Sequence, residues 1–242
     1  MSRISPDLTL PQSFLKPFPD PKDVFAGNVE LASTYLQPLV SVDLSFIDTD
    51  LQGWVHVVSP VEPCEGYVGD GTEEYHNYYC RPNWIGFRLD DHNRYEFLAD
   101  WKYFLAASDD PNIAQDPELK RHYEYRQDSF ARHKAAFAQH GRLLAVDNKY
   151  LTKEELLADP EEFFTDLETD AEFGNWASDD GFPLEFETSD ENCFVYPLTE
   201  DGRRFIYIGG VSGFAYGDRS ADFILLFFDP VTRIALLTFD WT

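Results

Sequence analysis

The stretch Asp222–Trp241 reads DFILLFFDPVTRIALLTFDW and combines two apolar runs with a turn. Every residue from Ile224 to Phe228 is apolar, so both faces of this segment are expected to be covered. That is typical of a strand at the centre of a sheet with helices on at least one side. The residues between the two runs, Asp229-Pro230-Val231-Thr232, have turn composition. The stretch therefore predicts two buried strands joined by a turn.

Further strands are indicated toward the N-terminus, where apolar and polar residues alternate. The candidate segments are 204–210, 193–198, 182–187, 94–98, 84–89, 53–58 and 40–46. Asp90-Asp91-His92-Asn93 is a good hairpin turn between two of them, although the helical spacing of apolar residues allows a helix over 95–107 instead. The pattern predicts an α+β fold, with an antiparallel or mixed sheet mainly from the C-terminal half and helices packed on one face.

One long helix is predicted from Asp116-Pro117 to about His140, with Gly141 as its terminating residue. Its bases have two interpretations: they pair with the protein's own acids, or they form half of a bipolar binding surface. Two short acidic helices are predicted after Thr152, which begins a capping box, and after Asp159-Pro160.

The first 19 residues are rich in proline, which removes backbone hydrogen-bond donors and restricts the preceding residue. We expect residues 1–19 to form an extended arm and residues 20–242 to form a single globular domain. Asp20-Pro21 is predicted to open a short helix at the junction, with the aspartate as N-cap.

Negative charge is concentrated in residues 154–202, which contain 17 Asp or Glu and no Lys or Arg, in a chain of net charge -25. Unpaired carboxylates must face water or a cationic partner, because burying them costs several kcal/mol each. The charge argues against direct nucleic-acid binding and against an anionic membrane surface, since both require clustered Lys and Arg. We therefore expect a basic protein as the partner.

The predicted contact residues all lie in this segment. Acids would attract the partner and aromatic rings would anchor it. The candidates are Glu161, Glu162, Asp166, Glu168, Asp170, Phe163, Phe164, Phe173 and Trp176.

Catalytic and metal motifs are weak in this sequence. Cys64, His76 and Cys80 lack the paired ligand spacing of a zinc site, so no metal and no cofactor are expected. The loop 61–82 is long enough for an enzyme site of unknown class, which is the first alternative function. Three dispersed cysteines and the absence of a signal-like apolar stretch favour the cytoplasm.

Two pieces of the chain resemble the SUKH superfamily. LPQSFL at 10–15 is similar to its opening Leu-Pro helix, and residues 208–210 with 222–224 and 228–229 are similar to its glycine-rich turn before a buried strand. The resemblance implies a bacterial immunity protein that neutralises a toxin. We therefore expect a non-enzymatic, acidic binding protein, and the further alternative is a regulator that mimics nucleic acid.

Overall fold

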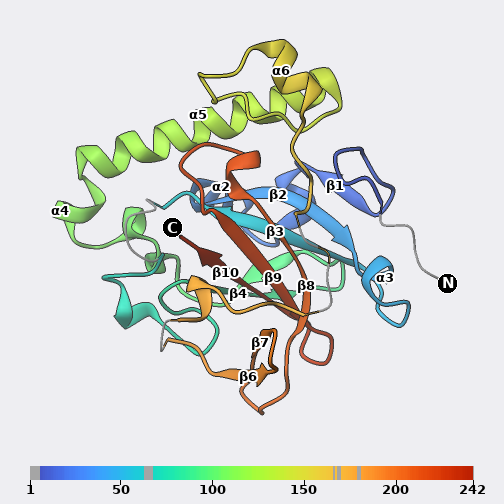
Figure 1. The fold of residues 1–242 in the computed structure, drawn as a ribbon. Helices are drawn as coiled ribbons and strands as arrows, with labels where there is room; N and C mark the ends of the chain where they lie inside the picture. The colour runs from blue at the N-terminus through green and yellow to red at the C-terminus, as the bar shows by residue number, and fades with distance from the viewer. Residues whose placement is uncertain (1–5, 63–67, 166, 168–169, 179–180, 242) are drawn as a thin grey trace.

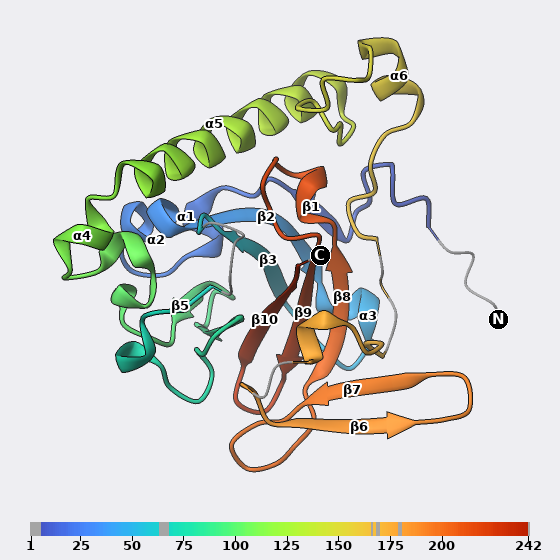
Figure 2. The same cartoon turned by 60° about the vertical axis from the view of Figure 1, so that its left-hand side comes forward.

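The computed structural model describes residues 6–62, 68–165, 167, 170–178 and 181–241. Its described strands form three antiparallel sheets, and helices lie beside them, which confirms the α+β class. In Figure 1 the long helix α5 (Pro117–His140) runs along the top and the sheets cross beneath it. The hairpin of β6 (Leu184–Thr188) and β7 (Cys193–Pro197) lies at the opposite end of the molecule (Figures 1 and 2).

The largest sheet has the strand order β5-β4-β10-β9-β8. Its strands are β4 (Trp84–Leu89), β5 (Tyr95–Phe97), β8 (Ile206–Val211), β9 (Phe223–Asp229) and β10 (Ile234–Asp240). The predicted turn joins β9 and β10, and Asp229 closes it by accepting hydrogen bonds from Thr232. The hairpin β4–β5 is also confirmed, because residues 101–107 form two short 3-10 turns in place of the alternative helix.

A second sheet comes from the N-terminal part and has the order β1-β2-β3. It consists of β1 (Leu15–Pro17), β2 (Leu36–Asp43) and β3 (Trp54–Pro60). The predicted strand 40–46 is wrong at its end, because the Asp43 side chain accepts from Ser45 N–H and starts helix α3 (Leu44–Ile47). Strand β1 lies within the proline-rich arm and pairs with β2.

Both faces of β9 are buried, as predicted. Ile224, Leu226 and Phe228 belong to the core cluster that also contains the valines of β2 and β3. Leu225 and Phe227 belong to a second cluster, which includes Trp84, Trp176 and Phe182. The large sheet is thus covered by the N-terminal sheet on one side and, on the other, by side chains from the acidic segment.

The remaining short helices connect these layers. They are α1 (Pro21–Val24), α2 (Val29–Tyr35), α4 (Pro111–Ala114) and α6 (Lys153–Ala158), with 3-10 turns η1 (Glu73–Tyr75), η2 (Trp101–Tyr103), η3 (Leu105–Ala107), η4 (Asn175–Ala177) and η5 (Gly213–Ala215). The N-cap at Asp20 and the capping box at Thr152 are confirmed. The helix predicted after Asp159-Pro160 does not form, because Glu161 N–H and Phe163 N–H donate to the distant carbonyls of Leu143 and Leu8.

Helix α5 has the predicted ends, with Asp116 as N-cap and Gly141 in the left-handed conformation at φ 64°. Among the ion pairs of the described residues, none joins a base of α5 to an acid of the segment 154–202. Arg132 pairs with Asp147 at 2.8 Å, while Lys120 and Arg121 pair with acids of the helix itself. Arg126 is buried and donates to the carbonyl of Asp218 at 2.8 Å. The helix is therefore part of the scaffold.

None of the helices within the described residues combines the length and apolar character needed to cross a membrane.

Candidate binding site

The acidic segment folds back on itself beside the large sheet. Residues 171–173 run along β7, with Phe173 N–H donating to the Cys193 carbonyl at 2.8 Å and Val195 N–H donating to the Ala171 carbonyl at 2.9 Å. The side chains of β6 are mostly exposed, which suits its alternation of Glu185 and Glu187 with less polar residues. This arrangement places residues 170–176 against the end of the large sheet.

A concave pocket of about 390 Å³ lies where this segment meets the sheet; we call it the acidic pocket. It is lined by Asp170, Glu172, Phe173, Gly174, Trp176, Tyr207, Phe223, Leu225 and Asp240. Three of these side chains are carboxylates, four are aromatic and none is a Lys or Arg. The pocket therefore offers acceptors and ring faces but no cation of its own.

The sheet supplies the floor of the acidic pocket. Tyr207 comes from β8, Phe223 and Leu225 from β9, and Asp240 from the last residue of β10. The Phe223 ring packs over Gly210 of β8, where a Cβ atom would approach the ring to 2.2 Å. The missing side chain at this position shapes the floor.

The wall of the acidic pocket is held by Trp176 and Gly174. Trp176 is buried against Trp84 and Phe227, and its indole N–H donates to the Glu172 carbonyl at 3.2 Å. A Cβ atom at Gly174 would lie 2.7 Å from the Asp240 carboxylate and 2.9 Å from the Trp176 ring. Glycine is therefore needed here to let carboxylate and indole approach each other.

The electrostatics of the acidic pocket favour a cation. Neither Glu172 nor Asp240 has an ion pair with a base among the described residues, and Asp240 Oδ1 is buried without a hydrogen-bond partner. Asp170 accepts a hydrogen bond from the Tyr196 hydroxyl at 2.9 Å; burial and this bond raise the pKa of Tyr196 to about 12. A buried acceptor without a donor carries a desolvation cost of about 1–3 kcal/mol, which an incoming donor removes.

Two exposed phenylalanines border the acidic pocket. Phe173 is 52% exposed and Phe186 of β6 is 50% exposed, and their ring centroids are 6.3 Å apart. Clustered apolar rings at the surface beside polar groups are typical of protein interaction sites.

The structure separates the predicted contact residues into groups. Asp170, Phe173 and Trp176 meet in the acidic pocket, although Trp176 is 2% exposed and forms a wall. Glu162 is exposed and Glu161 is partly buried, and neither lines this pocket. Asp166 and Glu168 lie outside the described residues.

Phe163 and Phe164 do not act as surface anchors. Both are fully buried in the main core, and Phe163 packs edge-on against Phe137 of α5. Their prediction as contact residues is wrong because the surrounding acids mark an exposed segment as a whole, whereas these two rings turn inward.

Among the described residues of the loop 61–82, Val61, Glu62, Val68, Thr72 and Cys80 are buried. Burial raises the pKa of the Cys80 thiol to about 12, and this thiol lies 3.8 Å from the Gly86 carbonyl. A thiol with its pKa raised in this way stays protonated at neutral pH and is a poor nucleophile. His76 Nε2 lies 2.9 Å from the Gly69 carbonyl, and Cys64 falls outside the described residues.

Sequence reasoning missed six residues of the acidic pocket: Glu172, Gly174, Tyr207, Phe223, Leu225 and Asp240. Glu172 and Gly174 lie within the acidic segment, and Glu172 could have been added from charge alone. The other four are strand residues, and only the pairing of β8, β9 and β10 brings them to the floor of the pocket. Their sequence signal is that of ordinary strands.

In the part of the chain that the structure describes, no group of three or more His, Cys, Asp or Glu side chains could hold a metal ion. No family model matches this chain, and no curated protein and no solved structure matches it.

Proposed function

We propose that this protein binds a basic protein partner and receives one of the partner's arginine or lysine side chains in the acidic pocket. The observation that carries the proposal is a concave site with three carboxylates, four aromatic side chains and no base. A guanidinium group is the best match, because it is planar, stacks on aromatic rings and donates several hydrogen bonds to carboxylates.

Two features beyond the pocket support a protein as the ligand. Phe173 and Phe186 offer exposed apolar area next to the carboxylates, which a free small cation would leave uncovered. The net charge of -25 attracts a basic surface over the whole molecule and raises the association rate at low salt. Long-range attraction would bring the partner in, and the acidic pocket would select its bound orientation.

Neutralisation of a toxin is the most specific form of this proposal. It rests on the sequence resemblance to immunity proteins and on the benefit of fast association to an inhibitor. A role of this kind is tested by co-expressing the protein with a candidate toxin from the same organism and measuring growth. A variant that lacks the three carboxylates of the acidic pocket serves as the negative control.

The binding proposal is tested with a fluorescent nona-arginine peptide, using anisotropy at low salt. The test variant combines Asp170→Asn, Glu172→Gln and Asp240→Asn. The control variant combines Glu154→Gln, Asp190→Asn and Glu191→Gln, which removes the same charge from exposed positions of the same segment. We expect at least about tenfold weaker binding for the test variant and less than about twofold for the control. Equal losses would show general charge attraction and contradict the proposal.

A further inference from the structure

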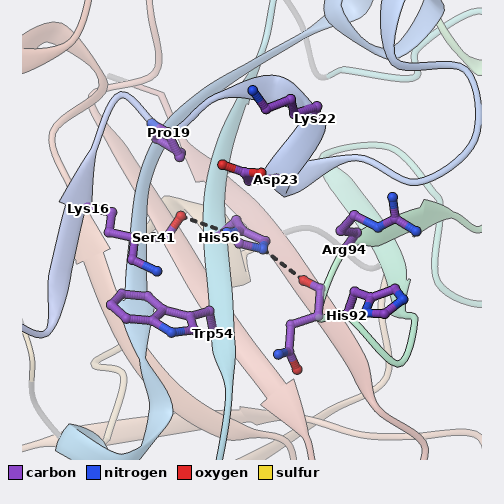
Figure 3. A pocket seen from close by; sticks show the side chains of 10 residues that line it. Lys16, Pro19, Lys22, Asp23, Ser41, Trp54, His56, His92 and Arg94 are labelled. Atoms are coloured by element: carbon purple, nitrogen blue, oxygen red, sulfur yellow. Dashed lines mark hydrogen bonds between the residues drawn. The ribbon is translucent and has the colours of Figure 1, made fainter.

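A second pocket, of about 410 Å³, lies on the outer side of the N-terminal sheet; we call it the N-terminal pocket. Figure 3 shows its side chains, which come from β1, α1, β2, β3 and the turn between β4 and β5. It is lined by Lys16, Pro19, Lys22, Asp23, Ser41, Trp54, His56, His92, Asn93 and Arg94. Three of these residues are Lys or Arg and one is acidic, the reverse of the composition of the whole chain.

The floor of the N-terminal pocket is a polar row across the sheet. Lys16 pairs with Ser41 in the register of β1 and β2, and Ser41 pairs with His56 in the register of β2 and β3. The neighbouring residues Val40 and Val57, which pair with each other, are buried in the core. Ser41 is 1% exposed and His56 is 4% exposed, so two buried polar side chains occupy positions on a pocket floor.

Hydrogen bonding fixes the polarity of this floor. The Asn93 carbonyl, 2.8 Å from His56 Nε2, can only accept, so Nε2 carries the proton. His56 Nδ1 is then an acceptor, and the Ser41 hydroxyl, 2.7 Å away, donates to it. Burial lowers the pKa of His56 to about 4, which keeps the ring neutral at neutral pH. Ser41 Oγ has therefore used its own proton and offers only lone pairs to a ligand.

The three cations of the N-terminal pocket, Lys16, Lys22 and Arg94, come from three segments of the chain: β1, α1 and the turn between β4 and β5. Lys16 Nζ lies 3.4 Å from the centre of the Trp54 ring and has no ion pair among the described residues. Lys22 is held by Asp20 at 2.9 Å, and Arg94 by Asp90 at 2.8 Å. Figure 3 shows Lys16 and Trp54 on one side of the floor and Arg94 with His92 on the other.

The backbone of the turn that carries Arg94 is also fixed. Asn93 adopts φ 63°, and its side-chain oxygen accepts from Arg233 at 3.2 Å. A Cβ atom at Gly53 would lie 2.5 Å from that oxygen, so glycine at this position leaves room for the Asn93 side chain. The site is therefore preorganised before any ligand enters.

From this geometry we propose that the N-terminal pocket binds a small phosphate monoester that carries a hydroxyl group. A phosphate monoester has three peripheral oxygens and can accept from three cations, whereas a carboxylate has two oxygens. The ligand hydroxyl would donate to Ser41 Oγ, which lacks a donor. The space of about 410 Å³ leaves room for the organic part beside Trp54. This site is independent of the acidic pocket.

Isothermal titration calorimetry with glycerol phosphate tests the proposal, with inorganic phosphate and glycerate as comparison ligands. The first variant is Lys16→Met, which keeps the apolar stem over Trp54 and removes the charge. Its control is Lys149→Met, because Lys149 also lies over an aromatic ring, 5.2 Å from the centre of Tyr150, outside the pocket. We expect at least about tenfold weaker binding of glycerol phosphate to Lys16→Met and no change for the control.

A second variant, Ser41→Ala, tests the hydroxyl contact. We expect it to weaken glycerol phosphate about tenfold while inorganic phosphate stays within about threefold, a difference that general loss of folding does not produce. The absence of binding at millimolar glycerol phosphate would overturn the proposal. So would equal affinity for glycerate, or equal binding by wild type and Lys16→Met.

Discussion

Replacing Glu62 by Gln should remove a pH-dependent loss of stability. Glu62 is 3% exposed, and burial raises its pKa to about 7 from an ordinary value of 4.5, although its carboxylate accepts from Tyr123 and from Leu105 N–H. The protonated form is thus preferred in the folded state. The free energy of unfolding is highest below pH 4.5, falls as the pH rises through 7, and levels off above about pH 8.

The size of the effect follows from the two pKa values. Their difference corresponds to about 3 kcal/mol across the whole window, most of which falls between about pH 5 and about pH 8.5. In Glu62→Gln an amide oxygen can still accept from Tyr123 and Leu105. The variant should therefore gain about 2–3 kcal/mol relative to wild type over that pH interval.

Urea denaturation of both proteins at several pH values measures this difference. Glu124→Gln is the control, because Glu124 lies on the outer side of the same helix as Tyr123 and is 65% exposed. Subtracting the two pH profiles cancels the titration of other groups. An unchanged difference between variant and wild type over the interval would refute the reasoning. A gain by wild type at high pH would show that the carboxylate has a stabilising partner.

The other predictions concern the helix, the acidic pocket and the buried histidine. Arg132→Glu should lower the free energy of unfolding by about 1–2 kcal/mol, since it places a second acid beside Asp147; Lys120→Glu is the exposed control, and equal urea midpoints would contradict this expectation. Gly174→Ala should weaken nona-arginine binding at least about threefold by displacing Asp240 or Trp176, and unchanged anisotropy curves would remove the glycine from the site. His56→Asn should reduce the stability lost on acidification, because the depressed pKa of about 4 stabilises the fold above pH 6.5 and this contribution disappears as the pH falls to 4; parallel melting profiles would exclude it.

Local signals predicted the elements that depend on neighbouring residues. The N-cap at Asp116, the proline after it and the glycine at 141 define α5 without any distant contact. The apolar run 224–228 likewise requires burial on both faces, whatever covers it. These parts of the fold could be obtained from spacing and capping chemistry alone.

The failures come from contacts between distant residues. Asp159-Pro160 has a valid helix start, yet hydrogen bonds to Leu143 and Leu8 hold the following residues extended. The acidic pocket was predicted in part, because charge identified Asp170 while strand pairing brought Asp240 beside it. The N-terminal pocket was missed because Lys16, Ser41 and His56 are separated in sequence and meet only through strand register. Strand register depends on contacts between distant segments, which the spacing of residues along the chain does not reveal.

The position of β10 has a consequence for the order in which the chain can fold during synthesis. Residues 234–240 lie between β4 and β9, so a strand made after all the other described strands occupies the centre of the largest sheet. The N-terminal sheet can pair as soon as residue 60 leaves the ribosome, whereas β4 must wait for more than a hundred further residues before its second partner, β10, exists. Until then its apolar side chains are exposed to chaperones and to other nascent chains. A ribosome stalled before residue 234 would therefore hold an open, aggregation-prone intermediate.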